Sequence, residues 1–482
     1  MRKEIKDPSV KQVLLVMVLF ILIMFSFMNW FGLPIQLALL TSWFMLMALG
    51  LWLGRSYSFM QSGLLKGISD GMEAVLILIS VGALIGSWIA SGIVPSIIYY
   101  GLSVMNPSIF LLAAMIICAV TSLATGTSFG TIGTAGIAMI GIGQGFDIPL
   151  PLVAGAAISG AYVGDKLSPL SDTTVMTASL TKVNIITHIK SMLYVSVPAF
   201  IISGLLFLLT GLFYVTNSAD LTQATQTMNA LNDQFQISWY MLIPPVIIIS
   251  LLALKQPAIP TIIFGSLLGV LWGYWFQNMA FLDSINTVYE GYSTNSGVPF
   301  IDNLLNSGGI VSMLEVILLI LLALGLGGLM ESIGVLRTIG NTLAKWATNS
   351  GKLTTSTMLS AFFGNFFGGA AYVSVITGSK ITEKNYEKLG IEKRVLSRNT
   401  EAGGTITTPM VPWSDGGVFM AATLGVATLA YLPFLWYHFL VIIISLVYGF
   451  TGKFIWYTDA TSPEIEQPSE KSSISASGKK KA

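Results

Sequence analysis

Four short polar clusters interrupt otherwise apolar stretches of this 482-residue chain. Two of them carry residues in the same order, Pro169-Leu-Ser171-Asp172 and Pro412-Trp-Ser414-Asp415. The other two, at 121–131 and 364–374, combine Gly with Thr, Ser or Asn. Pro removes a helical hydrogen bond and Gly permits a sharp turn, so each cluster frees backbone carbonyls. Carbonyl, hydroxyl and carboxylate oxygens are the ligands that hard cations such as sodium take, so the pattern predicts a cation site.

The composition places these clusters in a membrane. Hydrophobic residues make up 54% of the chain and charged residues 10%, and the mean hydropathy is +0.76. Soluble globular proteins carry roughly 25% charged residues, so the composition excludes a soluble enzyme, a disordered protein and a nucleic-acid binder. A single cysteine, Cys118, and two histidines argue against a Cys/His metal cluster. The chain is therefore predicted to be an all-α polytopic membrane protein without a resident cofactor.

Ten apolar stretches are long enough to cross a membrane, and two more read as re-entrant hairpins. The spans are 11–30, 34–54, 72–91, 149–181, 190–214, 237–253, 258–277, 310–332, 400–429 and 432–452, with 149–181 and 400–429 interrupted by polar clusters. The hairpins are 108–143 and 353–379, each broken at its middle by a polar cluster. Non-helical backbone persists at membrane depth only where it is buried in protein or lines a wet cavity.

The distribution of charges agrees with this count. With the N-terminus inside, 23 of the 24 Lys and Arg residues lie in or beside inside segments, and Lys166 is the exception. The outside loops carry acids instead, namely Asp147, Asp220, Asp233, Asp283, Glu290 and Asp302. The positive-inside rule then predicts a multi-pass protein of the cell membrane with both termini in the cytoplasm. The Ser-, Glu- and Lys-rich segment 458–482 is predicted to be a disordered cytoplasmic tail.

The chain resembles itself at a shift of 243 residues. The two Pro-x-Ser-Asp clusters coincide at this shift, and so do Gly126 with Gly369 and Gly160 with Gly403. We predict two repeats, an N-terminal unit 1–214 and a C-terminal unit 237–452, each with five crossings and one hairpin. Five is odd, so the second repeat is inverted in the membrane. Inverted repeats with paired broken helices are the architecture of secondary transporters, which bind their cargo near the midplane.

Two aspartates are the strongest candidates for binding the cation, because intramembrane carboxylates are costly and mark functional sites. Asp172 and Asp415 stand at matched positions, and we predict that one holds sodium while the other caps the half-helix that follows. Asp165 is an alternative site for a proton or a cation. Glu73 and Glu315, which match at a shift of 242, are assigned structural roles.

Lys166 is predicted to pair with Asp165, Asp172 or Glu401, or to meet a substrate carboxylate. Glu401 is expected to cap its helix, with proton handling as the alternative. The other candidates are the hydroxyl and amide side chains of the four clusters, for which a structural role in satisfying freed backbone groups is the alternative. They are Thr125, Thr127, Ser128, Ser168, Ser171, Thr173, Asn365, Tyr372, Ser374, Thr405, Thr407, Thr408 and Ser414.

These motifs resemble a known family. The run Thr125-Gly-Thr-Ser-Phe-Gly-Thr and the run Gly155-Ala-Ala-Ile-Ser-Gly-Ala-Tyr-Val-Gly-Asp-Lys-Leu-Ser-Pro-Leu-Ser-Asp-Thr-Thr look like the NhaC family of sodium/proton antiporters. Asn399-Thr-Glu-Ala-Gly-Gly is similar too, and the likeness covers about 11–452. The resemblance implies an elevator-type transporter, a homodimer, in which hairpins and broken spans slide against a fixed scaffold. Members of the family exchange sodium for protons, or malate for lactate with sodium and protons.

Two functions follow as predictions. The first is sodium-for-proton antiport, in which one carboxylate binds either ion. The second is sodium- and proton-coupled exchange of a small organic anion such as malate and lactate, or of an amino acid. A channel is disfavoured because a pore does not need broken, symmetric helices. An enzyme is disfavoured because there is no H-E-x-x-H motif and no Gly-x-Ser-x-Gly elbow in a plausible setting.

Overall fold

The structure is a computed structural model, and it describes residues 7–215, 221–294, 302, 305–306 and 308–458. Within these residues the regular secondary structure is helical, apart from an isolated antiparallel bridge between Ile391 and Tyr457. Helices satisfy their own backbone hydrogen bonds, which a lipid surrounding requires. The predicted tail 458–482 lies outside the described residues, except for Thr458.

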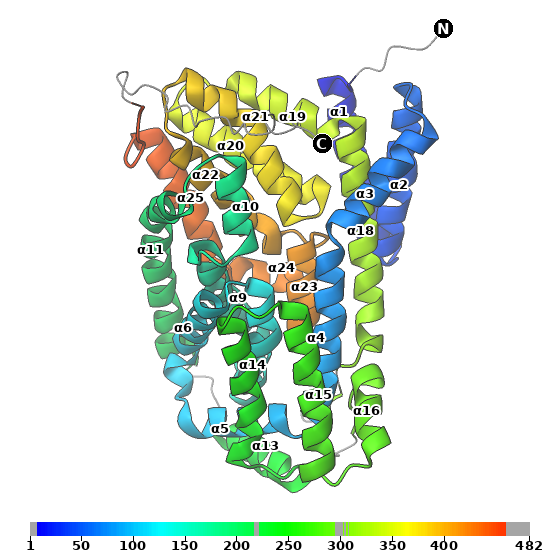
Figure 1. Cartoon of the computed structure of the whole chain (residues 1–482), viewed down its shortest axis with the longest axis vertical. Helices are drawn as coiled ribbons and strands as arrows, with labels where there is room; N and C mark the ends of the chain where they lie inside the picture. Colours follow the sequence, from blue (N-terminus) through cyan, green and yellow to red (C-terminus); the bar gives the residue numbers. More distant parts are fainter. Residues whose placement is uncertain (1–6, 216–220, 295–301, 303–304, 307, 459–482) are drawn as a thin grey trace, which may run out of the picture.

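The first half of the chain forms helices that alternate between long crossings and short segments (Figure 1). They are α1 (Val10–Phe25), η1 (Ser26–Trp30), α2 (Ile35–Trp52), α3 (Tyr57–Asp70), α4 (Met72–Ala90), α5 (Ile93–Val104), α6 (Pro107–Thr125), α7 (Ser128–Thr131), η2 (Ile132–Gly136), α8 (Ile137–Gly145), α9 (Leu150–Leu167), α10 (Asp172–Leu180), α11 (Ile185–Thr210) and η3 (Gly211–Val215).

The described residues of the second half form helices as well. Its helices are α13 (Leu221–Gln234), η4 (Trp239–Leu242), α14 (Ile243–Ala253), α15 (Ala258–Phe276), α16 (Phe281–Glu290), η5 (Val311–Met313), α18 (Leu314–Ile333), α19 (Val335–Trp346), α20 (Ser350–Gly368), α21 (Ala371–Lys388), α22 (Lys393–Gly403), η6 (Thr405–Met410), α23 (Asp415–Leu424), α24 (Thr428–Tyr431), η7 (Leu432–Phe434) and α25 (Trp436–Thr451).

Six helices in the described residues are long and apolar enough to cross a membrane, or eight if each of two bent pairs is one span. The number is smaller than the ten predicted spans because several predicted spans are not single long helices. The span 149–181 divides into α9 and α10, and 400–429 divides into the end of α22, η6 and α23. The span 237–253 forms the second arm of a pair bent by 97°. The breaks after α9 and α22 place irregular backbone among buried residues.

Two helical hairpins occupy the predicted hairpin segments. In the first, α6 ends at Gly126 and the chain returns through α7, η2 and α8. In the second, α20 ends at Gly369 and α21 returns. Both glycines cap the first arm with φ of 74° and 69°, a left-handed conformation that Gly adopts without a steric penalty. The two turns are therefore built in the same way.

Close contacts between small residues hold the bundle together. A Cβ atom added to Gly67 of α3 would lie 2.7 Å from the Cα of Gly328 on α18, and one added to Gly63 would lie 3.1 Å from the carbonyl oxygen of Gly328. Glycine is thus required where these two helices cross. Helix association in membranes depends on such backbone proximity, because lipid supplies no hydrophobic drive between helices.

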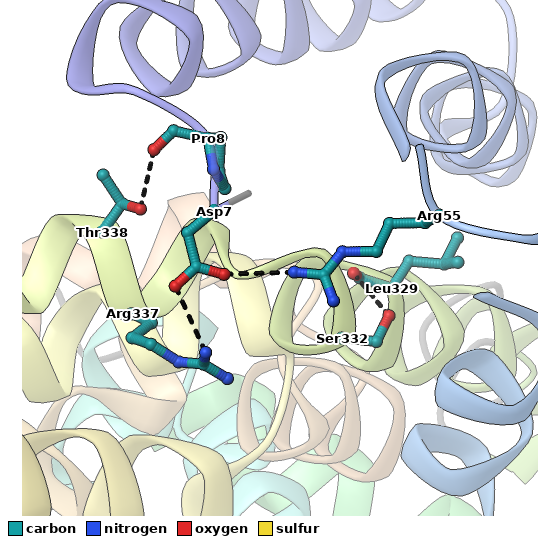
Figure 2. Close-up of polar contacts among 7 residues, drawn as sticks. All are labelled: Asp7, Pro8, Arg55, Leu329, Ser332, Arg337 and Thr338. Carbon is teal, nitrogen blue, oxygen red and sulfur yellow. Dashed lines mark hydrogen bonds and ion pairs between the residues drawn. The ribbon is translucent and has the colours of Figure 1, made fainter. Parts of the chain in front are cut away.

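The start of α1 and the end of α25 lie at one end of the molecule, while α5 and α13 lie across the opposite end (Figure 1). Asp7, which precedes α1, anchors the start of this helix through two ion pairs. Its carboxylate accepts hydrogen bonds from Arg55 (3.1 Å), in the α2–α3 connection, and from Arg337 (3.2 Å) of α19 (Figure 2). Thr338 donates to the carbonyl of Pro8 at 2.9 Å. These contacts join α1, α19 and the α2–α3 connection at one corner.

Candidate functional site

A cavity of about 280 Å³ lies where the two hairpin turns meet the two helix breaks. Five carboxyl side chains line it, those of Asp70, Glu73, Asp165, Asp172 and Asp415. Lys, Arg and His are absent from its described lining. A partly enclosed space with this excess of acidic groups attracts cations and repels anions. The cavity therefore has the chemistry of a cation site.

Asp165, at the end of α9, is the most tightly held of these acids. Only 7% of the residue is exposed. The hydroxyl of Ser128, on the first hairpin, donates to its Oδ2 at 2.6 Å, and the hydroxyl of Ser171, at the break, donates to its Oδ1 at 2.6 Å. Both carboxylate oxygens thus have a hydroxyl partner in a buried place, as a buried charge requires. Through these two hydrogen bonds, Asp165 connects the end of α9 to the first hairpin and to the break that follows α9.

The break between α9 and α10 satisfies its own freed carbonyls. The Thr174 hydroxyl donates to the carbonyl of Asp165 at 2.9 Å and lies 3.3 Å from that of Lys166. Ser168 donates to the carbonyl of Leu123 on α6 at 3.3 Å. The carbonyls at the end of α9 are therefore occupied by hydroxyl donors, and the side chains carry most of the remaining capacity to bind an ion.

At the second break, between α22 and α23, the hydrogen bonds are made by an amide side chain and not by a carboxylate. The Nδ2 atom of Asn365, on α20, donates to the carbonyl of Gly404 at 2.7 Å and to the Thr407 hydroxyl at 2.8 Å. The Thr408 hydroxyl lies 3.3 Å from Asn365 Oδ1. Ser414 donates to the Val411 carbonyl at 3.0 Å. These polar side chains bond to one another and to the backbone, which is a structural arrangement.

Asp172 and Asp415 differ although their sequence positions match. Asp415 is 8% exposed and accepts hydrogen bonds from the backbone N–H of Gly416 (2.7 Å) and of Ala371 (3.2 Å), the first residue of α21. Asp172 is exposed to the cavity. The half-helices are capped by serines: Ser171 accepts from Thr174 N–H, and Ser414 from Gly417 N–H. The predicted capping role of an aspartate is therefore wrong for α10 and α23, and Asp415 instead holds the start of the second hairpin's returning helix.

Lys166 and Glu401 lie away from the cavity lining, and both are fully buried. The Nζ atom of Lys166 has no hydrogen-bond partner in the described part of the chain, so the predicted close pairing with an acid is not observed. Asp165, next to Lys166 in sequence, lines the cavity and is bonded to Ser128 and Ser171 instead. Glu401 accepts a hydrogen bond from Thr177 at 2.7 Å. Glu401 stands in the last turn of α22, so it does not cap the start of that helix.

The predicted site residues therefore fall into three groups. Those that line the cavity are Thr127, Ser128, Asp165, Asp172, Thr173, Tyr372, Thr405, Thr408 and Asp415. Those that bond to the residues or backbone around it are Ser168, Ser171, Asn365, Ser374, Thr407 and Ser414. Lys166 and Glu401 form the third, separate group, and Thr125 lines an adjoining cavity.

Three ionisable residues of the lining were not among the predicted site residues, namely Asp70, Glu73 and Tyr162. Asp70 and Glu73 flank Gly71 at the joint between α3 and α4. The purely structural role predicted for Glu73 does not fit its exposed position on the lining of the cavity. Glu73 is a carboxylate inside the predicted apolar span 72–91, and this is a signal that could have identified it as a site residue.

The two halves share contacts at the same shift of 243 residues. Ser122 bonds to the carbonyl of Ala161, and Asn365 bonds to the carbonyl of Gly404. A Cβ added to Gly160 would lie 2.1 Å from the Met115 carbonyl oxygen, and one added to Gly403 would lie 2.4 Å from that of Met358. In both halves, the first arm of the hairpin packs on the broken helix through the same carbonyl and the same glycine.

The arrangement suits the reversible binding of a monovalent cation or a proton. No group of three His, Cys, Asp or Glu side chains in the described residues could hold a metal ion. The carboxylate and hydroxyl oxygens of the lining are suitable ligands for a hard cation. Because a carboxylate can bind either the cation or a proton, the two ions would compete for it.

An all-helical chain with apolar crossings, broken helices and an acidic cavity at their breaks is typical of a membrane transporter. Residues 160–453 match the model of the "Na+/H+ antiporter family". The chain is 51% identical to the malate-2H⁺/Na⁺-lactate antiporter of Bacillus subtilis over 96% of this chain and 99% of that protein. It is 36% identical to the Na⁺/H⁺ antiporter NhaC of Alkalihalophilus pseudofirmus over 84% of this chain and 87% of that protein. The arginine/ornithine antiporter ArcD of Halobacterium salinarum is 33% identical over 88% of this chain and 87% of that protein.

The chain therefore belongs to the Na⁺/H⁺ antiporter family, and it is a transporter rather than an enzyme. The predicted family resemblance is confirmed.

Proposed function

We propose that this protein exchanges sodium for protons at Asp165. The observation that carries the proposal is the pair of 2.6 Å hydrogen bonds from Ser128 and Ser171 to the two oxygens of this buried carboxylate. Hydroxyl groups can turn, so the same serines that donate to an empty carboxylate can direct lone pairs at a bound sodium ion. Asp172 and Asp415 line the same cavity and supply further negative charge.

Coupling follows from competition at one group. A proton on Asp165 removes the charge that attracts sodium, and a sodium ion bound to Asp165 lowers its affinity for a proton. The site then crosses the membrane carrying either a sodium ion or a proton. Sodium moving down its gradient in one direction therefore drives protons in the opposite direction.

We further propose that the two halves are inverted repeats and that transport is elevator-like. Support comes from the equivalent contacts of Ser122 and Asn365 and of Gly160 and Gly403. Hairpins α6–α8 and α20–α21 with the broken helices α9–α10 and α22–α23 would form the moving part. The other crossings would form the scaffold. Crosslinks between hairpins and scaffold test this, since they should stop transport.

The orientation and assembly remain predictions. Both described chain ends lie at one end of the molecule, as two cytoplasmic termini in a cell membrane would require (Figure 1). Labelling of cysteines introduced near these ends, in intact cells and in inverted vesicles, tests the side. The predicted homodimer is tested by measuring the mass of the purified protein in detergent.

A second candidate function is exchange of malate for lactate coupled to sodium and protons. It is favoured by the 51% identity to the malate-2H⁺/Na⁺-lactate antiporter across almost the whole of both chains. It is favoured also by the volume of the site, since a cavity of about 280 Å³ exceeds what a single ion needs. In this reading, sodium and protons couple at Asp165 while an organic acid shares the cavity system.

Purified protein in liposomes that trap a pH-sensitive dye separates the two. A sodium gradient without organic acid drives a proton flux if the first function holds, and Asp165→Asn removes it. A proton flux that needs malate or lactate would support the second function. The absence of any sodium-dependent proton flux under either condition would contradict both.

A further inference from the structure

A second cavity, of about 430 Å³, adjoins the acidic one. The two share Glu73, Gly126, Thr127 and Asp172 in their lining. The second cavity is lined in addition by the connection between α14 and α15, which contributes Lys255 and Gln256. Among the described residues that line the two cavities, Lys255 is the one basic side chain. The acidic cavity therefore adjoins a cavity that is lined by a basic side chain.

The backbone at Lys255 is unusual for a residue with a side chain. Its φ is +66°, its N–H donates to the Leu252 carbonyl at 2.9 Å, and the Gln256 N–H donates to the Leu251 carbonyl at 3.0 Å. These bonds form the helix-ending turn in which Gly is usual. A left-handed conformation costs a side-chain-bearing residue about 1–2 kcal/mol. Lysine occupies a position that the backbone alone would give to glycine.

A comparison with Lys182 shows how far helix-end electrostatics explain this. Lys182 ends α10 in the same turn, with φ of +56° and bonds from Lys182 N–H to Ser179 and from Val183 N–H to Ala178. A lysine at a helix C-terminus gains from the helix dipole in either place. Lys182, however, lines neither cavity. What distinguishes Lys255 is the space that it faces.

We propose that Lys255 binds the carboxylate of a small hydroxycarboxylic acid in this second cavity. The inference rests on the second candidate function above and assigns it a ligand. An ammonium group forms charge-assisted hydrogen bonds with carboxylates. The Gln256 amide and the Thr125 hydroxyl line the same cavity and can bond to the substrate's own hydroxyl.

The acidic side of the cavity pair decides how such an acid enters. A monocarboxylate needs only Lys255 to balance its charge. A dicarboxylate brings a second negative charge towards Asp172 and Glu73, which line both cavities. That charge is repelled unless a proton or a sodium ion neutralises it. The geometry therefore makes the binding of a dicarboxylate more dependent on protons than the binding of a monocarboxylate.

The experiment measures uptake of radiolabelled malate and lactate into liposomes that contain the full-length protein. In Lys255→Gln, the loss of a charged hydrogen bond worth about 1.5–3 kcal/mol should raise the half-saturating concentration of both acids about 10- to 100-fold. The half-saturating sodium concentration for proton exchange should change much less. Lys182→Gln, with the same chemistry in the same turn, should leave the organic-acid values within about twofold of the unaltered protein. Lys255→Arg should keep most of the affinity of the unaltered protein for both acids.

The same experiment can overturn the inference. Unchanged half-saturation for both acids in Lys255→Gln would exclude Lys255 as their ligand, and so would an equal loss in Lys182→Gln. Absence of saturable uptake of either acid by the unaltered protein would also overturn it, while sodium/proton exchange measured in the same vesicles could still stand. If the unaltered protein shows no sodium/proton exchange, that result would instead contradict the proposed function itself.

Lowering the external pH provides a second readout that a structural role for Lys255 would not move. As the pH is lowered, the half-saturating concentration of malate should decrease more than that of lactate. Equal pH dependence for the two acids would contradict the placement of the second carboxylate beside Asp172 and Glu73.

Discussion

The two helix breaks share a skeleton and differ in chemistry. At the first break, Asp165 is held by hydroxyls of Ser128 and Ser171 and faces the cavity. At a shift of 243 residues, the corresponding position holds Thr408, whose hydroxyl lies 3.3 Å from Asn365 Oδ1. A group that can carry charge is thus replaced by one that cannot. On the proposed function the first break binds the ion, whereas Asn365, Thr407 and Thr408 at the second break are joined by neutral hydrogen bonds.

Asp172 and Asp415, the acids at the start of α10 and α23, differ too, but here the acid of the second half is the one held by hydrogen bonds. Asp415 is tied to backbone N–H groups of Ala371 and Gly416, whereas Asp172 is free to meet solvent in the cavity. Matched positions in a duplicated structure can therefore serve different purposes. We infer that the first half supplies the ion site and that the second half mainly fixes the geometry around it.

The largest expected effect is that of Asp165→Asn. The substitution keeps the shape of the side chain and removes the group that exchanges sodium for a proton, so sodium-driven proton flux should fall to background in liposomes. Asp147→Asn is the matched control, because Asp147 is exposed at the end of α8 and its left-handed φ of 57° suits Asn. Retained exchange in Asp165→Asn would show that the ion binds elsewhere.

Paired glycine substitutions test the shared skeleton. Gly160→Ala and Gly403→Ala would each place a Cβ within 2.4 Å of a carbonyl oxygen on the first arm of a hairpin. Overpacking of this kind typically costs about 1–3 kcal/mol. Thermal unfolding of the purified variants should show similar losses for the two. A loss confined to one of them would break the equivalence of the two halves.

Removing single hydroxyls should have a smaller effect on transport, and it should change sodium affinity only in the first half. Ser128→Ala and Ser171→Ala each take away a hydrogen bond to a charged group, worth about 1.5–3 kcal/mol, and should raise half-saturating sodium roughly tenfold or more. Ser414→Ala, at the position matching Ser171, removes a helix cap and should lower stability by about 1 kcal/mol with little change in sodium affinity. Equal sodium effects in Ser171→Ala and Ser414→Ala would contradict the division of roles.

The smallest effect is expected for Asp172→Asn. Its side chain is exposed and would act on sodium only through screened attraction, so half-saturating sodium should rise by no more than about fivefold, and less at high ionic strength. The measurement is the sodium dependence of proton flux at two salt concentrations. Complete loss of transport would instead place the ion at Asp172, one of the two candidates that the sequence pattern favoured.

Much of the fold follows from the sequence because apolar length and charge asymmetry report directly on membrane crossings. The hairpin turns at Gly126 and Gly369 and the breaks around Pro169 and Pro412 lie where the composition changes, since Gly and Pro act on the local backbone. The divided spans were harder to predict because hydropathy does not register a bend. The family, which rests on long motifs, could be predicted as well.

The ranking of the acids could not be predicted in the same way. Symmetry favoured Asp172 over Asp165, yet which carboxylate is buried depends on how far the first hairpin reaches, and Ser128 is 37 residues from its partner. Lys166 is next to Asp165 in sequence but does not contact the acids predicted for it. Glu73 enters the cavity through the packing of α4 on the bundle. Each of these depends on tertiary contacts that local patterns do not specify.

The most direct test of the central claim is proton release on sodium binding by purified protein in weakly buffered detergent. Sodium added to the unaltered protein should displace protons from Asp165, and the half-saturating sodium concentration should rise as the pH is lowered, because protons then compete more strongly. Asp165→Asn should release none. Sodium-dependent proton release that persists in Asp165→Asn would contradict the account and place the exchange at another carboxylate of the cavity.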